Sequence, residues 1–543
     1  TDTDTLDSIE SAIGSDNSDT FIMDSSFTTD TNTIDGKDGV DVLDYSNYTA
    51  NGITVNLGNQ NEQTIATGDT DQIKDVENLI GGTKNDTITG SDADNSLDGN
   101  EGSDRFYGSN GTDIINGGVD SDGTADTDIA DYSNMTQKVV VTANGSSYTV
   151  LKPDGKSDTL TNIEEIQGSD YKDEMTGDNV VSADDIFKGG DNSDTLIGNL
   201  GNDKLYGEEG DDTLRGGAGD DYLHGGADGS DTADFSDATG SGIDVDLSQT
   251  GSQTVGGNLG SDTLVDIENV LGSDFADTIA GNDKANTLKG GSGNDTFSFS
   301  NTAGETTGDY IDGGDDVDTV DYSQLNSKIE IDLNEENNGA TNVTVGTNSS
   351  DHQIENVENI KGTAQNDTIS GNSSQNTIDG GAGDDTLDGE GGVDATHLDT
   401  LIGGLGNDTF VVNDKGFTHY DGTTDQGTGF VDTADFSTIA NDSADKVNVN
   451  LQDGTFTLNG ATINGTTFSG IEGAIGGAGD DSIVGTTTAN TLIGGAGDDT
   501  LLGNGATSGI DYIDGGANTT NGDFVSFNYT GANGVTVDLS NGS

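Results

Sequence analysis

Single apolar residues recur along this chain at intervals of nine, and a glycine-rich turn precedes each of them. Residues 216–224 read G-G-A-G-D-D-Y-L-H, and residues 494–502 read G-G-A-G-D-D-T-L-L. The sixth residue of the unit is usually Asp or Asn and the eighth is usually apolar. This pattern predicts a turn followed by a short strand whose middle side chain points inward. Two turns and two strands then form a coil of about 18 residues, and stacked coils form two parallel sheets around a thin aliphatic core.

The spacing holds over runs of consecutive repeats. Glycines nine residues apart begin these runs at Gly81, Gly189, Gly272, Gly362 and Gly476. Glycine at the first, second and fourth positions permits a left-handed backbone and a close approach of neighbouring turns. Because the repeats stay in phase, we expect the turns to line up along each edge of the sheets.

A longer period overlies the nonapeptides. Ile or Val followed by Glu opens each run of repeats, at residues 9–10, 76–77, 163–164, 267–268, 357–358 and 471–472. An aromatic marker, Asp-(Tyr/Phe)-Ser, follows at residues 44–46, 131–133, 234–236, 321–323 and 435–437, with a degenerate copy at 526–528. These features divide the chain into repeat units at residues 76–162, 163–266, 267–356 and 357–470, with partial units at 1–75 and 471–543.

After the marker comes a segment in which apolar and polar residues alternate. It occurs at residues 53–57, 243–247, 329–333, 447–451 and 535–539. Alternation with period two predicts a half-buried strand. A variable polar loop is then expected before the next Glu-bearing segment. No segment shows the helical period, so the predicted fold class is all-β, a parallel β-solenoid with longer strand-loop insertions.

Composition and charge change this picture in one respect. Asp and Glu total 101 against 17 Lys and Arg, which gives a net charge of −84, and hydrophobic residues make up only 29% of the chain. Such a charge excludes a nucleic-acid binder that neutralises phosphates. The absence of cysteine excludes disulfides and thiolate metal sites, and no apolar stretch is long enough for a transmembrane helix. Low hydrophobicity with high charge is also the signature of disorder. We therefore expect a hard divalent cation, bound by carboxylate and carbonyl oxygens, to cancel the charge.

The nonapeptides resemble those of the RTX (repeats-in-toxin) calcium-binding family, whose repeats form a right-handed parallel β-roll. The resemblance implies many Ca²⁺ ions, on the order of one per turn, type I secretion from a Gram-negative bacterium and folding outside the cell. It assigns the sixth-position carboxylates as calcium ligands: Asp86, Asp104, Asp113, Asp194, Asp203, Asp212, Asp221, Asp295, Asp385, Asp408, Asp481 and Asp499. It adds the first-position glycines Gly99, Gly108, Gly189, Gly198, Gly207, Gly216, Gly290, Gly380, Gly403, Gly476 and Gly494. Asn95, Asn286, Asn376 and Asn490 hold the sixth position elsewhere, where a weaker or absent site is expected.

The residues predict no catalytic site, so the chain is expected not to be an enzyme. The histidines, His224, His352, His397 and His419, lie far apart in the sequence, and no H-E-x-x-H or G-x-S-x-G motif occurs. His224, at the ninth position of its repeat, is expected to lie on a surface turn. The marker aromatics are expected to be core plugs, with a carbohydrate platform as the alternative. The marker Asp is either a cation ligand or a turn cap.

The leading functional hypothesis is an extracellular, cell-surface structural or adhesive protein of the S-layer, sheath, filament or biofilm-adhesin kind. We expect self-association into a lattice or filament, with cell-surface polysaccharide as a further partner. The alternatives are the repeat region of a type I-secreted enzyme or toxin, and an ordered carbohydrate- or ice-binding surface. Both ends fall inside a repeat unit, so the sequence is expected to be a piece of a longer protein.

Overall fold

The fold is all-β in a computed structural model of the chain. The structure describes residues 11–24, 31–67, 69–119, 126–179, 183–299, 308–337, 340–346, 352–390, 398–412, 418–422, 430–439, 444–463, 465–504, 510–517 and 522–527. None of these residues forms a helix, so no helix among them could cross a membrane. The chain divides into two compact units, residues 1–271 and 272–543. The division falls close to the predicted boundary between residues 266 and 267.

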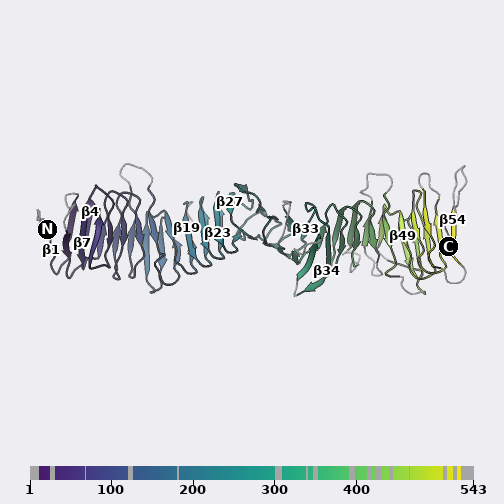
Figure 1. Cartoon of the computed structure of the whole chain (residues 1–543), viewed down its shortest axis with the longest axis horizontal. Helices are drawn as coiled ribbons and strands as arrows, with labels where there is room; N and C mark the ends of the chain where they lie inside the picture. The colour runs from purple at the N-terminus through teal and green to yellow at the C-terminus, as the bar shows by residue number, and fades with distance from the viewer. Residues whose placement is uncertain are drawn as a thin grey trace. The chain divides into compact units, whose positions relative to one another are not determined.

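A short parallel series of β1 (Ser11–Ile13), β3 (Thr31–Asp35) and β7 (Asp69–Lys74) begins the first unit. Two long parallel sheets build the rest of the unit, and their strands run as successive rungs in Figure 1. One sheet pairs, in order, β5 (Thr54–Asn56), β9 (Thr87–Thr89), β11 (Arg105–Tyr107), β13 (Ile129–Asp131), β17 (Glu165–Gln167), β19 (Ile186–Asp191), β21 (Lys204–Glu209), β23 (Tyr222–Asp228) and β27 (Ser261–Val265). The other pairs β2 (Thr20–Asp24), β4 (Val42–Asn47), β8 (Asn78–Ile80), β10 (Ser96–Asp98), β12 (Ile114–Asn116) and β16 (Ser157–Thr161), and then β14 (Val140–Ala143), β18 (Glu174–Thr176), β20 (Thr195–Leu200), β22 (Thr213–Ala218), β24 (Thr232–Asp234) and β28 (Asn269–Leu271).

The second unit repeats this plan. One sheet pairs β29 (Thr278–Gly281), β31 (Thr296–Phe299), β33 (Thr319–Asp321), β37 (Asn359–Lys361), β39 (Thr377–Ala382), β41 (Asp399–Leu405), β43 (Thr418–Asp421) and β48 (Thr467–Ser469). The other pairs β30 (Thr287–Ser292), β32 (Tyr310–Asp315) and β36 (His352–Glu355), and then β34 (Ile329–Asn337), β38 (Thr368–Ser370), β40 (Thr386–Asp388), β42 (Thr409–Val411), β44 (Thr433–Asp435), β49 (Gly473–Ile475), β51 (Thr491–Ile493) and β53 (Tyr512–Asp514). A third parallel series joins β45 (Val447–Asn450), β50 (Ser482–Val484), β52 (Thr500–Gly503) and β54 (Phe524–Phe527).

The predicted coil of two turns and two strands is confirmed. Thr195 pairs with Thr213 across one coil, and Lys204 pairs with Tyr222 across the next. The eighth-position residues form the core, and Leu196, Leu205 and Leu214 are all fully buried. In these nonapeptide strands one side chain per strand supplies the apolar burial, which explains how few hydrophobic residues suffice there.

The sequence predicted polar loops between the alternating strands and the Glu segments. This prediction is wrong in several places, where the chain forms strands. In the first unit β15 (Ser147–Leu151) pairs antiparallel with both β14 and β16, and β6 (Glu62–Ala66) pairs antiparallel with β7 (Asp69–Lys74). In the second unit β35 (Ala340–Val345) lies antiparallel between β34 and β36. These hairpin strands keep many exposed or half-buried polar residues, and β15 fully buries only Val150, so the sequence shows no clear period there. The alternating segment at residues 535–539 lies outside the described residues.

Candidate metal sites

The sixth-position aspartates form a ladder along each edge of the sheets. The backbone N–H of Asp203 donates to Asp221 Oδ1 one coil later, at 2.8 Å. The carbonyl of Asp203 accepts the N–H of Tyr222, also at 2.8 Å. The same N–H to carboxylate bond joins Asp194 to Asp212 and Asp295 to Asp318. Each aspartate therefore uses one carboxylate oxygen to hold the preceding coil and keeps the other oxygen inside its own turn.

The turn itself leaves no room for a side chain at its first residue. A Cβ built on Gly198 would overlap Asp203 Oδ2 and would lie 2.6 Å from the carbonyl oxygen of Gly216 in the next coil. The backbone of that next turn is left-handed at Gly217 and Gly219, with φ of 97° and 155°. Glycine is needed there because residues with a Cβ rarely adopt this conformation. Carboxylate and carbonyl oxygens of successive coils thus converge on a small space beside the first glycine, which we call the cradle. A side chain at that glycine position would fill it.

Eight of the predicted ligands share one further property. Each is at most 2% exposed, and its Oδ2 accepts no hydrogen bond from any residue that the structure describes. They are Asp104, Asp194, Asp203, Asp212, Asp221, Asp295, Asp385 and Asp499. Buried polar atoms are almost always satisfied, and a buried carboxylate without a partner is costly.

Burial also raises the pKa values of these carboxyls far above their usual range. The pKa of Asp104 is raised to about 9 and that of Asp194 to about 8, chiefly by desolvation and further by neighbouring aspartates, against the effect of backbone hydrogen bonds. The pKa values of Asp203 and Asp212 are raised to about 7 for the same main reason. Without a counter-ion, each of these carboxyls would near neutral pH either keep its proton or carry a poorly solvated negative charge.

This donor set fits calcium. Ca²⁺ takes six to eight oxygen ligands, from carboxylates, backbone carbonyls and water, in flexible geometry. The cradle offers carboxylate and carbonyl oxygens and neither nitrogen nor sulfur donors. A divalent ion there would supply the partner that each Oδ2 lacks, and would stabilise the charged form of the carboxyl.

The predicted glycine ligands follow the same geometry with two exceptions. The carbonyls of nine of them face the ladder aspartate of the preceding coil: Gly99, Gly189, Gly198, Gly207, Gly216, Gly290, Gly380, Gly403 and Gly494. Gly108 instead lies against the Tyr132 ring, and its carbonyl accepts a hydrogen bond from Asn134 Nδ2. Gly476 shares the cradle of its own turn with Asp481.

Two predicted carboxylates sit in turns of a different kind. Asp86 accepts the N–H of Ile53 at Oδ1 and the N–H of Gly82 at Oδ2. Asp481 accepts the N–H groups of Val447 and Gly477 in the same way. Each belongs to the opening turn of its run, and backbone donors engage both of its oxygens. Asp408 is buried in a ladder turn, and its Oδ1 accepts the Asp385 N–H.

Asparagine at the sixth position brings its own donor. Asn95 Nδ2 donates to the Glu77 carbonyl at 2.7 Å, and Asn376 Nδ2 donates to the Glu358 carbonyl at 2.8 Å. The amide oxygen of Asn95 meanwhile accepts the Ser91 N–H. The amide nitrogen thus donates to the carbonyl of the neighbouring coil, in the place that a cation would take. The buried oxygens of these turns therefore have hydrogen-bond donors from the chain itself. Asn286, also at this position, is buried and its oxygen accepts the Asn282 N–H.

A lysine serves the turn of Asp113. Lys152, whose side chain is 1% exposed, places Nζ 3.1 Å from Asp113 Oδ2 and 2.5 Å from Asp158 Oδ1. The same ammonium donates to the carbonyl of Ser109 at 2.5 Å. This turn holds two carboxylates and a carbonyl, like the others, and an ammonium group lies among them.

The structure adds ladder aspartates that the nonapeptide spacing missed. Asp128, Asp231, Asp262 and Asp318 each accept, at Oδ1, the N–H of the preceding sixth-position aspartate. Insertions of varying length precede them, so they fall out of phase with the glycines. A signal existed, because three of them stand three residues before a marker Asp.

The aromatic markers are core plugs, as expected. Tyr132, Phe235, Tyr322 and Phe436 are at most 2% exposed. Every described marker Asp caps a turn: Asp44, Asp131, Asp234, Asp321 and Asp435 each accept the N–H of the residue two positions later.

Three of the histidines lie in described strands and far apart in the chain. The prediction that His224 lies on a surface turn is wrong, because His224 lies within strand β23 beside Tyr206 and Tyr222. His352 is buried, with Nδ1 3.5 Å from Asp309, and His419 Nδ1 contacts Thr467 Oγ1 at 2.7 Å. His397 lies outside the described residues.

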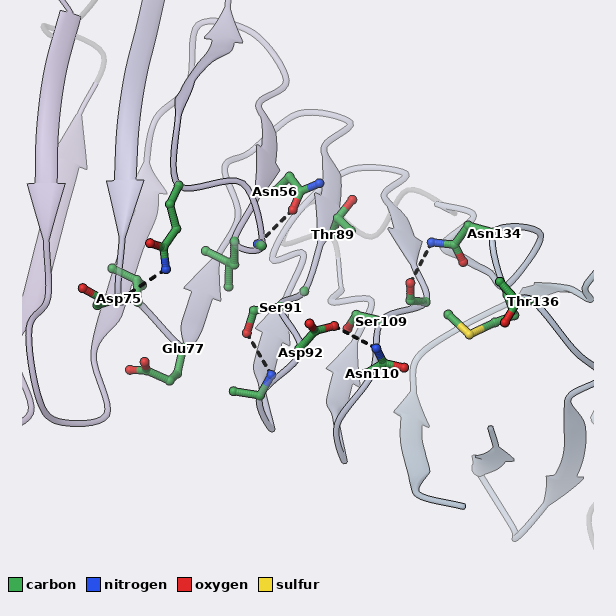
Figure 2. Close-up of a pocket in the computed structure, with 18 residues that line it drawn as sticks. Asn56, Asp75, Glu77, Thr89, Ser91, Asp92, Ser109, Asn110, Asn134 and Thr136 are labelled. Atoms are coloured by element: carbon green, nitrogen blue, oxygen red, sulfur yellow. Dashed lines mark hydrogen bonds between the residues drawn. The ribbon is translucent and has the colours of Figure 1, made fainter. Parts of the chain in front are cut away.

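One groove of the first unit is lined in part by the turns of two successive coils. Figure 2 shows its polar lining, in which Ser91 and Asp92 of one turn adjoin Ser109 and Asn110 of the next. Asn110 Nδ2 donates to Asp92 Oδ1 at 2.8 Å. The exposed faces of the turns are therefore tied together by side chains as well as by the buried ladder.

Comparison with known families decides what these turns are. The RTX calcium-binding nonapeptide repeat matches residues 75–106, 89–123, 181–214, 198–232, 271–301, 361–395, 398–413 and 475–505, which together cover less than half of the chain. The chain carries RTX calcium-binding nonapeptide repeats. A search of curated proteins found no match. The RTX repeats contain all eight aspartates with a buried Oδ2 that lacks a described donor.

Proposed function

We propose that this chain is an extracellular structural or adhesive repeat protein that folds when it binds calcium and then associates with copies of itself. The observation that supports calcium-dependent folding most directly is the set of eight buried carboxylates whose Oδ2 has no described donor. A net charge of −84 opposes any compact state until cations reduce it. Because the unfolded chain lacks a preformed site, the free energy of calcium binding becomes folding free energy.

Self-association is the second step of the proposal. Repeated coils present the same surface many times, so a weak lateral contact is multiplied along the length of a repeat array. Acidic surfaces repel each other in monovalent salt, whereas a divalent ion shared between carboxylates of two chains joins them. Asp244, on the exposed face of β25 (Asp244–Asp246), is one such carboxylate. Asp246 and Asp332 also accept hydrogen bonds within their own turns, which leaves them weaker ligands for a shared ion.

A calcium titration read by two methods tests both steps. We expect the circular dichroism of strands to appear first and light scattering to rise at higher calcium, because shared surface sites are more exposed and less complete. A strand spectrum that survives complete chelation would contradict calcium-dependent folding. A folded chain that stays monomeric at millimolar calcium would contradict self-assembly and favour the repeat region of a secreted enzyme or toxin.

A further inference from the structure

The junctions between runs of repeats contain a short acidic turn that differs from the nonapeptide. Five such turns run from a left-handed residue through a buried Ile or Val to Glu: Asp75–Glu77, Asn162–Glu164, Asp266–Glu268, Asn356–Glu358 and Gly470–Glu472. The φ of the first residue ranges from 47° at Asp75 to 68° at Gly470. A left-handed Asp or Asn is uncommon and turns its carbonyl in a direction that an extended residue does not.

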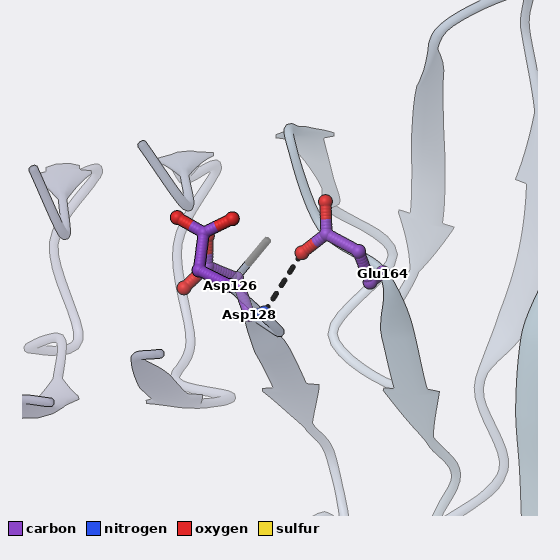
Figure 3. Close-up of side chains that lie close together, drawn as sticks. All are labelled: Asp126, Asp128 and Glu164. Carbon is purple, nitrogen blue, oxygen red and sulfur yellow. Dashed lines mark hydrogen bonds between the residues drawn. The ribbon is translucent and has the colours of Figure 1, made fainter. Parts of the chain in front are cut away.

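The glutamate takes the hydrogen-bonding place of a sixth-position aspartate. Glu77 Oε2 accepts the N–H of Asp41 at 2.9 Å, and Glu358 Oε2 accepts the N–H of Asp318 at 2.9 Å. Figure 3 shows the equivalent bond from Asp128 to Glu164, at 2.8 Å. In an ordinary coil the Oδ1 of the next aspartate makes this bond. The junction therefore continues the carboxylate ladder with a longer side chain.

The left-handed residue supplies the carbonyl. A Cβ built on Gly36 would overlap both Asp41 Oδ2 and the carbonyl oxygen of Asp75. A Cβ built on Gly313 would meet Asp318 Oδ2, at 2.5 Å, and would overlap the carbonyl of Asn356. In the nonapeptide ladder the first glycine of the next turn provides that carbonyl. The short turn thus delivers a carbonyl and a carboxylate from two residues that are only two positions apart.

A buried acceptor points into this cradle. Asp41 and Asp318 are 0% exposed, and the Oδ2 of each accepts no hydrogen bond from the described part of the chain. At the second junction one carboxylate oxygen from each of Asp126, Asp128 and Glu164 lies within 4.8 Å of the other two. Two or three carboxylates with an adjacent carbonyl match the oxygen ligands that Ca²⁺ takes.

We propose that the junction turns are calcium sites of their own, outside the nonapeptide pattern, with the glutamate as a ligand. At the first junction the donors are Asp41 Oδ2, the Asp75 carbonyl and the Glu77 carboxylate. At the fourth they are Asp318 Oδ2, the Asn356 carbonyl and the Glu358 carboxylate. The inference rests on the proposed calcium binding by the repeats. It implies that each run of repeats begins against a bound ion.

The test counts bound calcium in the double variant Glu77→Gln, Glu358→Gln. Glutamine keeps an oxygen that can accept the aspartate N–H and removes only the charge that an ion needs. We expect equilibrium dialysis against Ca²⁺, with the metal measured by atomic emission, to show about two fewer ions per chain. The matched control is Glu174→Gln, Glu330→Gln, which changes the charge equally at two exposed glutamates paired with Lys138 and Lys328. This control is expected to keep the wild-type count.

Two outcomes separate this inference from the function on which it rests. If Asp212→Asn lowers the count and the glutamate variant does not, the junction glutamates are backbone caps and the inference is overturned. If the wild-type chain binds no calcium, the proposed function itself fails. The single variants Glu77→Gln and Glu358→Gln, each expected to lose about one ion, provide the same test if the double variant does not fold.

Discussion

Two turns of the first unit share the same electrostatic problem, a buried carboxylate with a carbonyl beside it, but a cation of the chain lies in only one of the two. At Asp113 the cradle receives the ammonium of Lys152, whereas at Asp203 the carboxylate Oδ2 has no described donor and a nearby carbonyl faces it. Both aspartates are 1% exposed, and both continue the N–H to carboxylate ladder. The lysine shows what the turn needs, which is positive charge among buried oxygens. Lys152 supplies that charge from the chain at Asp113, and under the proposed function calcium supplies it from solution at Asp203.

The largest expected effect is that of calcium removal, and it should differ between the two turns. As free calcium is lowered stepwise with a chelator, we expect hydrogen exchange to accelerate first at the amides of Asp203 and Tyr222. The amides of Asp113 and Thr159, which bond across the lysine-containing turn, should stay protected to lower calcium. Repeat arrays permit such local differences, because each coil contacts only its neighbours. Simultaneous loss of protection at both turns would remove the distinction.

Replacing ladder ligands comes next in size. The double variant Asp212→Ala, Asp221→Ala should lose the ions of two consecutive turns, one from each ladder, and unfold at lower temperature in limiting calcium. The midpoint of the calcium titration should rise several-fold, since binding is linked to folding. Circular dichroism melts at fixed free calcium measure this. Lys156→Ala is the control, because the Lys156 side chain forms an exposed pair with Asp94, and such pairs contribute about 0–1 kcal/mol. Equal effects of the two changes would contradict the ligand assignment.

Substitutions of Lys152 test whether its ammonium group occupies the place of a calcium ion. Lys152→Met fills the space without charge, leaves Asp113 and Asp158 buried without their cation, and should destabilise the chain by about 3–5 kcal/mol. Lys152→Ala removes the same charge but leaves room for an ion. We expect the alanine variant to bind one additional calcium and to regain stability as calcium rises. Denaturant unfolding at low and high calcium, with a metal count, distinguishes the two variants. Identical calcium responses would mean that the lysine does not stand in for an ion.

Proton binding gives a smaller effect on stability. Its dependence on pH has the opposite sign to that of most carboxylates, because burial raises these pKa values instead of lowering them. The folded pKa values of Asp104 and Asp194 lie near 9 and 8, above those of an unfolded chain near 4. In the calcium-free chain these groups therefore favour folding below about pH 4 and lose that contribution as pH rises toward 9. We expect more strand circular dichroism at pH 5 than at pH 8 in chelator. With calcium present, the same acidification should raise the calcium midpoint, because protons compete for the ligands.

Much of this organisation was predictable from the sequence because its period is short and rigidly kept. The apolar eighth residue and the sixth-position Asp, as in Leu214 and Asp212, predicted the core and the ladder. Equivalent sequence positions nevertheless hold different chemistry. Asp86 and Asp203 both occupy the sixth position, but only the turn of Asp203 has left-handed second and fourth residues, Asn199 and Gly201. In the turn of Asp86 the fourth residue is Lys84, and the N–H of Gly82 donates to Asp86 Oδ2 within the same turn.

Contacts made by insertions could not be predicted from the period. Lys152 reaches Asp113 because β15 and its turn bring the side chain back over a coil 39 residues earlier. The nonapeptide pattern contains no information on that return. The junction glutamates were visible as a repeated sequence feature, but their role depends on a left-handed carbonyl two residues earlier. Contacts that side chains make across long insertions therefore do not follow from the repeat pattern.

The smallest expected effect comes from turning a self-satisfied turn into an ion-binding one. In Asn376→Asp the new carboxylate would replace the amide that donates to the Glu358 carbonyl at 2.8 Å, and would face that carbonyl without a proton. In chelator the change should destabilise the chain by about 1–3 kcal/mol, since a buried acceptor loses its donor. In calcium, an ion can bind between the two oxygens, so we expect one additional bound calcium and little net loss of stability. Gln375→Glu, at an exposed position of the same turn, is the control for added charge. If Asn376→Asp destabilises the chain equally with and without calcium, the amide is a structural donor in a turn that cannot hold an ion. The equivalence between nitrogen donors and calcium would then apply to Lys152 alone.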